Sequence, residues 1–301
     1  MVTIVAGRSD GLHEVGARAR VHLGGRDVTA VAPDAGGWWA ITGQHEVWRS
    51  SADGSWERVT TVEGLQARCL AVTGAGVLVG TSGGHLLRVD EGWAEPLESF
   101  EQVPGREGWY TPWGGPPDVR SVAEDPDGRL YVNVHVGGVA RSSDAGLRWE
   151  PTIDIDADVH QVLADARGRL VAATARGLAV SFDLGDSWVF ETAGLHGNYL
   201  RSAAVAGDTV LVGASTGPAT RHAAVYRSDG IGGALERCRR GLPEWFGANI
   251  DTHCLAAAGS ATAFGTADGQ LFVSADEGRS WALAADGPGP VRCVGISPDR
   301  L

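Results

Sequence analysis

A short phrase with the order Ser-x-Asp-x-Gly-x-x-Trp recurs three times in this 301-residue chain, at 142–149, 181–188 and 274–281. Each copy follows a run of alternating apolar residues, which is typical of a β-strand. The phrase predicts a tight turn, because Gly tolerates positive φ and the Asp carboxylate accepts hydrogen bonds from free N–H groups. The Trp is expected to lie back on the neighbouring strand with its indole N–H bonded. We therefore expect these aspartates to be structural and not catalytic.

Eroded copies extend the repeat at 51–56, 88–93 and 226–230. Upstream of each copy lie an apolar strand, a turn, a second strand, a Gly-containing bend and a third strand that runs into the phrase. Four short antiparallel strands per unit are typical of a β-propeller blade. We expect the six first strands to start near Thr29, Arg68, Arg120, His160, Arg201 and His253.

The two ends of the chain predict a seventh blade. Residues 291–299 resemble 119–127, a first strand with its turn, and residues 2–12 resemble 261–271, a second and a third strand. Segments 291–301 and 1–24 are thus expected to share one blade and to close the ring, which removes exposed sheet edges. We predict an all-β fold and a single domain over 1–301, a seven-bladed β-propeller with four-stranded antiparallel blades.

The formal net charge of −12 leaves no basic stripe for a phosphate backbone, so we expect no nucleic-acid partner. No stretch is apolar enough to span a bilayer, and the N-terminus lacks the charged start and long apolar core of an export signal. We expect a cytoplasmic monomer with no membrane contact.

The four cysteines lack the spacing of metal ligands; they are Cys69, Cys238, Cys254 and Cys293. Three of them share one repeat position, at which the other blades carry Ala30, Ser121, Gln161 and Ser202. We interpret them as small buried side chains in the crowded middle of the ring. A disulfide or a reactive nucleophile is the alternative.

A second repeat position gathers charge at the entry to each first strand. Aligning the blades places seven residues there: Thr29, Arg68, Arg120, His160, Arg201, His253 and Arg292. Two residues earlier, on the same side of a strand, stand Asp27, Gln66, Asp118, Asp158, Tyr199, Asp251 and Pro290. These Asp-x-Arg and Asp-x-His pairs either neutralise one another and link the ring, or present guanidinium groups to a small anionic molecule.

Histidines favour the same face of the ring. Four imidazoles are candidates for a divalent metal site with an open position for water or substrate: His135, His160, His196 and His253. Asp154, Asp156 and Asp158 stand beside them in the sequence. No His-x-His spacing occurs, so each histidine is equally consistent with a hydrogen-bonded pocket residue. A divalent metal ion is the one cofactor that this pattern suggests.

Long aromatic loops enter the same face. The loop 97–117 carries Phe100, Trp109, Tyr110 and Trp113, the loop 241–247 carries Trp245, and residues 217–222 form an insertion. Flat rings beside a polar funnel suit a carbohydrate-like or another flat ligand, or they pack on one another as a plug.

On its three full and three eroded phrases, the whole chain resembles the Asp-box, or BNR-repeat, propellers. That resemblance implies the propeller fold and brings in sialidases, xyloglucan-cleaving glycosidases, sortilin-type receptors and a photosystem assembly factor. It therefore includes enzymes and binding proteins alike. The Arg-Ile-Pro signature of sialidases is missing here.

The sequence predicts a ligand-binding or scaffold propeller of undetermined activity that holds a small polar or anionic molecule, or a protein loop, in its central funnel. The ligand-binding candidates are Arg68, Arg120, His160, Tyr199, Arg201, His253, Arg292, Trp113 and Trp245. The alternative is a glycoside hydrolase-like or metal-dependent enzyme. Glycoside hydrolysis needs a pair of carboxylates, for which the candidates are Asp118, Asp158, Glu244 and Asp251.

Overall fold

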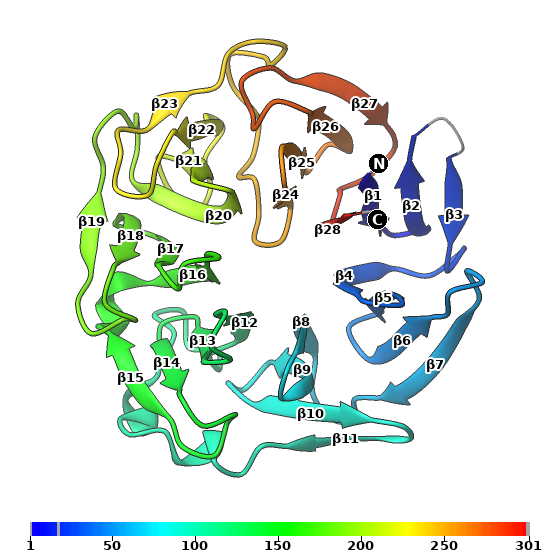
Figure 1. Cartoon of the computed structure of the whole chain (residues 1–301), viewed down its shortest axis with the longest axis vertical. Helices are drawn as coiled ribbons and strands as arrows, with labels where there is room; N and C mark the ends of the chain where they lie inside the picture. The colour runs from blue at the N-terminus through cyan, green and yellow to red at the C-terminus, as the bar shows by residue number, and fades with distance from the viewer. Residues whose placement is uncertain (1, 17–18, 299–301) are drawn as a thin grey trace.

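Seven antiparallel sheets of four strands each form a ring around a central axis (Figure 1). The computed structural model describes residues 2–16 and 19–298. Within these residues the prediction of an all-β propeller with seven four-stranded blades is confirmed. The parts of the seventh blade expected at 17–18 and 299–301 lie outside the described residues.

We number the blades by the chain order of their first strands. Blade one contains β4 (Val28–Asp34), β5 (Gly37–Thr42), β6 (Glu46–Ser50) and β7 (Trp56–Thr61). Blade two contains β8 (Ala67–Thr73), β9 (Gly76–Thr81), β10 (Leu86–Asp90) and β11 (Trp93–Pro96). Blade three contains β12 (Val119–Glu124), β13 (Leu130–Val134), β14 (Gly138–Ser142) and β15 (Glu150–Ile153).

The remaining blades follow in the same direction around the ring. Blade four contains β16 (Val159–Ala164), β17 (Leu170–Thr174), β18 (Gly177–Ser181) and β19 (Val189–Glu191). Blade five contains β20 (Tyr199–Ala206), β21 (Thr209–Ser215), β22 (Ala224–Ser228) and β23 (Glu236–Arg237). Blade six contains β24 (Leu255–Ala258), β25 (Ala261–Gly265), β26 (Gln270–Ser274) and β27 (Ala282–Asp286). Blade seven contains β28 (Cys293–Pro298), β1 (Val2–Arg8), β2 (Gly11–Val15) and β3 (Arg20–His22).

Helical structure in the described residues is limited to three short 3-10 turns, η1 (Phe100–Gln102), η2 (Arg106–Gly108) and η3 (Ile155–Ala157). None of the helices in this part of the chain is long and apolar enough to cross a bilayer.

The first strands stand around the axis, and each contacts the first strands of both neighbouring blades (Figure 1). The ring is closed by the two ends of the chain, because β1 pairs with β28 from Val2↔Pro298 to Gly7↔Cys293. This pairing confirms the predicted closure. It also leaves the inner strand β28 with a partner that comes from the opposite end of the sequence.

The hydrophobic core lies between neighbouring blades. One buried cluster, for example, joins Ala30 and Ile41 of blade one to Val79 and Leu87 of blade two. Because each strand faces two blades, alternating side chains on both of its sides are covered, which explains the apolar runs in the second strands.

The recurring phrase forms the predicted turn between the third and fourth strands. In all three copies the Ser hydroxyl accepts from the Gly N–H at 2.8–2.9 Å, and the Asp carboxylate accepts from the N–H four residues on at 2.8–2.9 Å. The Gly residues have positive φ, and so does the residue before each of them. The indole N–H groups of Trp188 and Trp281 donate to carbonyls, whereas that of Trp149 donates to the Ser99 hydroxyl. These carboxylates are thus occupied in their own turns.

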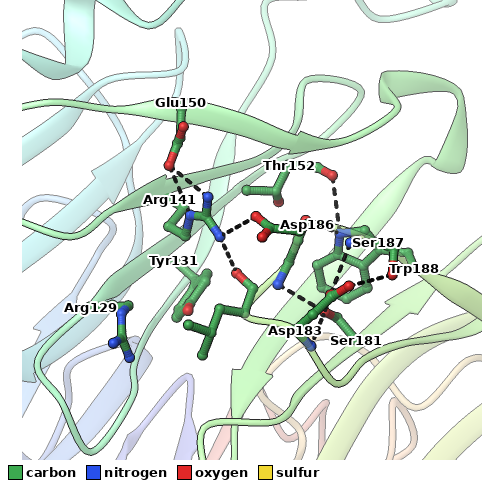
Figure 2. Close-up of polar contacts among 12 residues, drawn as sticks. Arg129, Tyr131, Arg141, Glu150, Thr152, Ser181, Asp183, Asp186, Ser187 and Trp188 are labelled. Atoms are coloured by element: carbon green, nitrogen blue, oxygen red, sulfur yellow. Dashed lines mark hydrogen bonds and ion pairs between the residues drawn. The ribbon is translucent and has the colours of Figure 1, made fainter.

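An arginine from the preceding blade also holds the turn. Arg141 of β14 donates to the carbonyl of Leu184 in the turn of blade four. Figure 2 shows the same guanidinium donating to Asp186 in that turn and pairing with Glu150 on its own blade. Arg227 repeats this contact by donating to the Glu277 carbonyl in the turn of blade six. The turns therefore link blades on the face opposite the entries to the first strands.

Acid should weaken the fold through these turns. Hydrogen bonds from Ser187 and Ser280 lower the pKa of Asp183 and of Asp276 from 3.8 to about 2. Because the folded pKa lies below the unfolded one, the stabilisation is complete above about pH 4 and is lost as the pH falls towards 2. The double variant Asp183→Ala and Asp276→Ala should be less stable at pH 7 and should lose less stability between pH 4 and pH 2. Urea unfolding at a series of pH values measures this.

The control for this experiment is Asp268→Ala, which removes an exposed carboxylate outside the phrase. It should leave the pH dependence of the wild-type protein unchanged. A double variant with the wild-type slope between pH 4 and pH 2 would contradict the assignment.

The cysteine position lies where blades approach each other closely. The Cys69 thiol lies 3.6 Å from the Val119 carbonyl at the start of β12, and the Cys254 thiol lies 3.3 Å from the Val291 carbonyl just before β28. A Cβ added at Gly80 would lie 2.5 Å from Sγ of Cys69. The four cysteines are free and buried, and burial raises the pKa of Cys69 to about 12. The interpretation as small buried side chains is confirmed.

Candidate functional site

Register shifts interrupt the first strands at the charged repeat position. They fall between residues 28 and 30, 67 and 69, 119 and 121, 159 and 161, and 200 and 202. The residue skipped by each shift is Thr29, Arg68, Arg120, His160 or Arg201. A bulge bends the strand and redirects the skipped side chain. His253 and Arg292 take the corresponding places just before β24 and β28.

Six of these seven residues line a cavity of about 580 Å³ on the entry face, and His160 does not. The guanidinium-bearing residues that line it are Arg68, Arg120, Arg201, Arg221 and Arg292. The lining also contains the carboxylates of Asp118 and Asp251 and the imidazole of His253. The structure thus brings together all four arginines of the repeat position. Arg221, from the predicted insertion at 217–222, was not among the sequence candidates, because no other blade has an equivalent residue.

Three of the repeat arginines are paired with the aspartate of the next blade. The distances are 3.4 Å for Arg68 to Asp118, 3.1 Å for Arg201 to Asp251, and 2.6 Å for Arg292 to Asp27. The interpretation that these charges link the ring is therefore correct for blades two, five and seven. Their ligand-binding role remains a prediction.

Arg120 departs from this pattern. Its counterpart in the next blade, Asp158, lies against two histidines, and among the described residues the Arg120 guanidinium has no ion pair and no hydrogen bond. Burial, and then the positive charge of Arg201, lower the pKa of Arg120. Arg221 is likewise without a charged partner in the described part of the chain, and it is exposed at the rim. The cavity therefore carries two guanidinium groups without a direct ion pair in the described residues, although the carboxylates of Asp251 and Asp118 act on Arg120 through their charge.

His253 lines the cavity and reaches across the ring to blade three. It lies in the segment leading into β24, which reaches towards the centre of the ring (Figure 1), and its Nε2 lies 2.6 Å from the backbone carbonyl of Arg120 in blade three. Burial lowers the pKa of His253, so the neutral imidazole donates this hydrogen bond. Beside it, the Thr252 hydroxyl donates to the Arg201 carbonyl at 3.0 Å. Thr252 was missed in the sequence because only the tertiary structure brings it to the axis.

Of the four predicted metal ligands, the structure brings together only His135 and His160. Their ring centroids are 5.3 Å apart, and Asp158 joins them, with donor atoms of all three residues within 4.8 Å of one another. Asp154 caps η3 by accepting from Asp156, and neither aspartate belongs to the cluster. Burial would raise the pKa of Asp158, but the contact with His135 and the nearby charges lower it.

His196 and Trp245 lie elsewhere. The two ring nitrogens of His196 contact the Tyr226 hydroxyl and the His222 carbonyl, each at 2.8 Å, and Trp245 packs against this histidine. Arg237 stacks on the other side of the group, 3.8 Å from the Trp245 ring centroid. These rings pack on one another, as the plug interpretation holds, and none of them lines the cavity.

The aromatic residues of the long loop 97–117 differ in exposure: some pack in the core, and others are open to a ligand. Phe100 is buried and packs with Trp109 and Trp149 in the core between blades two and three. Trp113, in contrast, is 64% exposed, and its ring lies 5.1 Å from that of His135. Tyr199 covers His160 in a similar way, at 4.8 Å.

The structure places the carboxylates considered for glycoside hydrolysis in different surroundings. Asp118 and Asp251 line the cavity, but each faces an arginine. Glu244 is exposed and does not line it. Asp158 lies against His135 and His160, and the catalytic role of all four carboxylates stays a prediction.

The comparisons with known proteins establish the fold alone. No family model and no curated protein matches the sequence. A catalytically inactive virginiamycin B lyase from Staphylococcus aureus with quinupristin is 12% identical, covers 96% of this chain and 92% of its own, and has a TM-score of 0.63. The structure of YCF48 bound to D1 peptide is 15% identical in sequence, and the match covers 89% of this chain and 83% of the YCF48 chain, with a TM-score of 0.59. The structure of U3-55K is 17% identical in sequence, and the match covers 91% of this chain and 85% of the U3-55K chain, with a TM-score of 0.63. Because proteins with different functions share this propeller fold, it selects none of their functions.

Proposed function

We propose that this protein is an Asp-box propeller that binds a small anionic molecule, a carboxylate or a phosphate, in its axial cavity. The observation that carries the proposal is the excess of positive charge there: five guanidinium groups line the cavity and only three of them have a paired aspartate, in a chain whose net charge is −12. The Ser-x-Asp-x-Gly-x-x-Trp turns support the Asp-box assignment.

Arg120 is the residue on which recognition is proposed to depend. A partly buried cation without a partner is unfavourable, because burial penalises its charge. An anion in the cavity would supply the missing partner, and the planar guanidinium presents paired donors suited to a carboxylate or a phosphate. The cavity volume of about 580 Å³ lies in the range of small-molecule sites.

The neighbouring groups support the same assignment. The ion pair with Asp251 fixes the Arg201 guanidinium and so orients the N–H donors of Arg201 that remain free. The hydrogen bond from His253 anchors the backbone of Arg120. Arg221 at the rim adds a second free charge that would attract an anion from solution.

The test is a screen of carboxylates and phosphates by thermal shift at constant ionic strength, followed by calorimetry on the compounds that stabilise the protein. The variant Arg120→Met should weaken anion binding at least about tenfold, as expected for the loss of a charge-assisted hydrogen bond. It should also leave the unliganded protein as stable as the wild type or more stable, by about 1 kcal/mol, because an unpaired buried charge is removed.

The matched control is Arg167→Gln, which changes the net charge by the same amount but removes an exposed arginine paired with Asp208 outside the cavity. It should bind the anion like the wild type. Equal binding by Arg120→Met and the wild type, or no stabilisation by any small anion, would contradict the proposal. If the protein binds an acidic peptide but no small anion, the proposed ligand would be a protein loop and not a small molecule.

A further inference from the structure

We propose that His135, Asp158 and His160 form a binding site for one divalent transition-metal ion, of the zinc class, beside the axial cavity. The three residues belong to two adjacent blades: His135 follows β13 of blade three, and Asp158 and His160 lie at the start of β16 in blade four. Their backbones are tied into the ring, because the His135 N–H donates to the Asp118 carbonyl and the Asp158 carbonyl accepts from Ala175.

The protonation pattern of His160 carries the argument. Its Nδ1 lies 2.6 Å from the Leu200 carbonyl, which only a ring N–H can satisfy. Nε2 of the neutral ring therefore bears a lone pair. This nitrogen is buried in a side chain that is 0% exposed, and it has no hydrogen-bond partner.

The lone pair of His160 faces another acceptor. Nε2 lies 3.7 Å from Oδ2 of Asp158, which is beyond hydrogen-bond distance, so neither atom satisfies the other. Oδ1 of Asp158, 3.0 Å from Nε2 of His135, also lacks a hydrogen bond of acceptable geometry. Unpaired acceptors that converge in a buried place are unfavourable unless a cation lies between them.

A protonated His160 does not resolve this arrangement. Even with a proton on Nε2, the distance of 3.7 Å to Oδ2 of Asp158 is too long for a hydrogen bond, so this nitrogen would stay unpaired. A metal ion would satisfy the same acceptors without adding a proton to the buried ring. Its binding would require His135 to carry its proton on Nδ1, so that Nε2 is free to coordinate.

The donor set indicates the class of ion. Two imidazole nitrogens and one carboxylate oxygen suit zinc, cobalt or a similar ion better than magnesium or calcium, which prefer oxygen ligands. Donors about 2.0–2.2 Å from a tetrahedral ion lie roughly 3–3.5 Å apart, and the distances of 3.0 and 3.7 Å are close to this. Three protein ligands leave at least one position open for water or for a bound molecule.

The exposed ring of Trp113 beside His135 and the nearby guanidinium of Arg120 mark the surroundings of this site. The proposal does not depend on anion binding in the cavity, because it rests on the three ligands alone. A protein that binds metal but no anion, or the reverse, would separate the two proposals.

The experiment uses full-length protein without an affinity tag, purified without chelator. Elemental analysis after dialysis with Zn²⁺ should find about one ion per chain, and titration with Co²⁺ should give the visible absorption bands of a four- or five-coordinate nitrogen and oxygen site. The variant Asp158→Asn should weaken binding at least about tenfold. Asn tolerates the positive φ of 50° at this position, so the backbone should be preserved.

His135→Gln is a second variant from a different blade and should show the same loss. The matched control is His196→Gln, which removes a histidine outside the cluster and should bind metal like the wild type. A metal content equal to that of the buffer together with no Co²⁺ bands in the wild type would overturn the proposal, as would wild-type affinity in both ligand variants.

Discussion

Deletion of β1 should abolish the cooperative thermal unfolding of this protein. β1 stands between β28 and β2, and without it the inner strand of blade seven loses its partner while β2 and β3 are left as an isolated hairpin. A two-stranded hairpin is marginally stable at best, and open sheet edges promote aggregation. We expect the deletion variant lacking residues 2–8 to show no cooperative transition in circular dichroism and to elute as aggregate in size-exclusion chromatography.

Single substitutions within β1 test the same ring closure with a smaller perturbation than the deletion, and one of them serves as a matched control. Val5 is 1% exposed, so Val5→Asp buries an unpaired charge and should lower the free energy of unfolding by several kcal/mol, about 3 or more. Val2, on the same strand, is 38% exposed, and Val2→Asp should change the free energy of unfolding by less than about 1 kcal/mol. A deletion variant that unfolds cooperatively near the wild-type temperature would show that the ring does not depend on this closure.

Replacing His253 with alanine should give the largest loss of stability of any single substitution at the axis. The change leaves the Arg120 carbonyl of blade three without its donor and places alanine at a φ of 64°. An unsatisfied buried carbonyl and a left-handed alanine together cost about 2–4 kcal/mol. Chemical denaturation of the wild type and of the variant measures the difference.

His253→Asn is the matched variant, because its amide can donate a hydrogen bond and Asn accepts a left-handed backbone. The loss in free energy of unfolding for His253→Asn should be no more than half of the loss for His253→Ala. If the alanine and asparagine variants are equally stable, the hydrogen bond across the axis contributes nothing to the stability of the fold.

Much of the fold follows from local signals. The Gly and Asp of each turn satisfy conformational and hydrogen-bonding needs within about eight residues, so they repeat visibly in every intact copy. The end segments could be matched because a strand and its turn have the same pattern in every blade, and the first strands begin within two residues of the expected positions.

The site was less accessible to this reasoning. Alignment gathered Arg68, Arg120, Arg201 and Arg292 correctly, because equivalent positions in a ring converge on its axis. It could not show which of them are neutralised, since each partner comes from the next blade and its reach depends on a bulge in the first strand. The sequence also grouped His196 with His160 as a candidate metal ligand, whereas the ring of His196 is held by Tyr226 and His222.

By itself the sequence determined the blade, the number of blades and the strand that joins the two ends, because these depend on turn chemistry and on a repeating apolar pattern. Only the tertiary structure decided that Arg120 is left without a carboxylate and that Asp158 instead faces His135 and His160. The physical reason is that ion pairs and converging lone pairs depend on distances of a few ångströms between side chains of different blades. Such distances are determined by how the blades pack against one another.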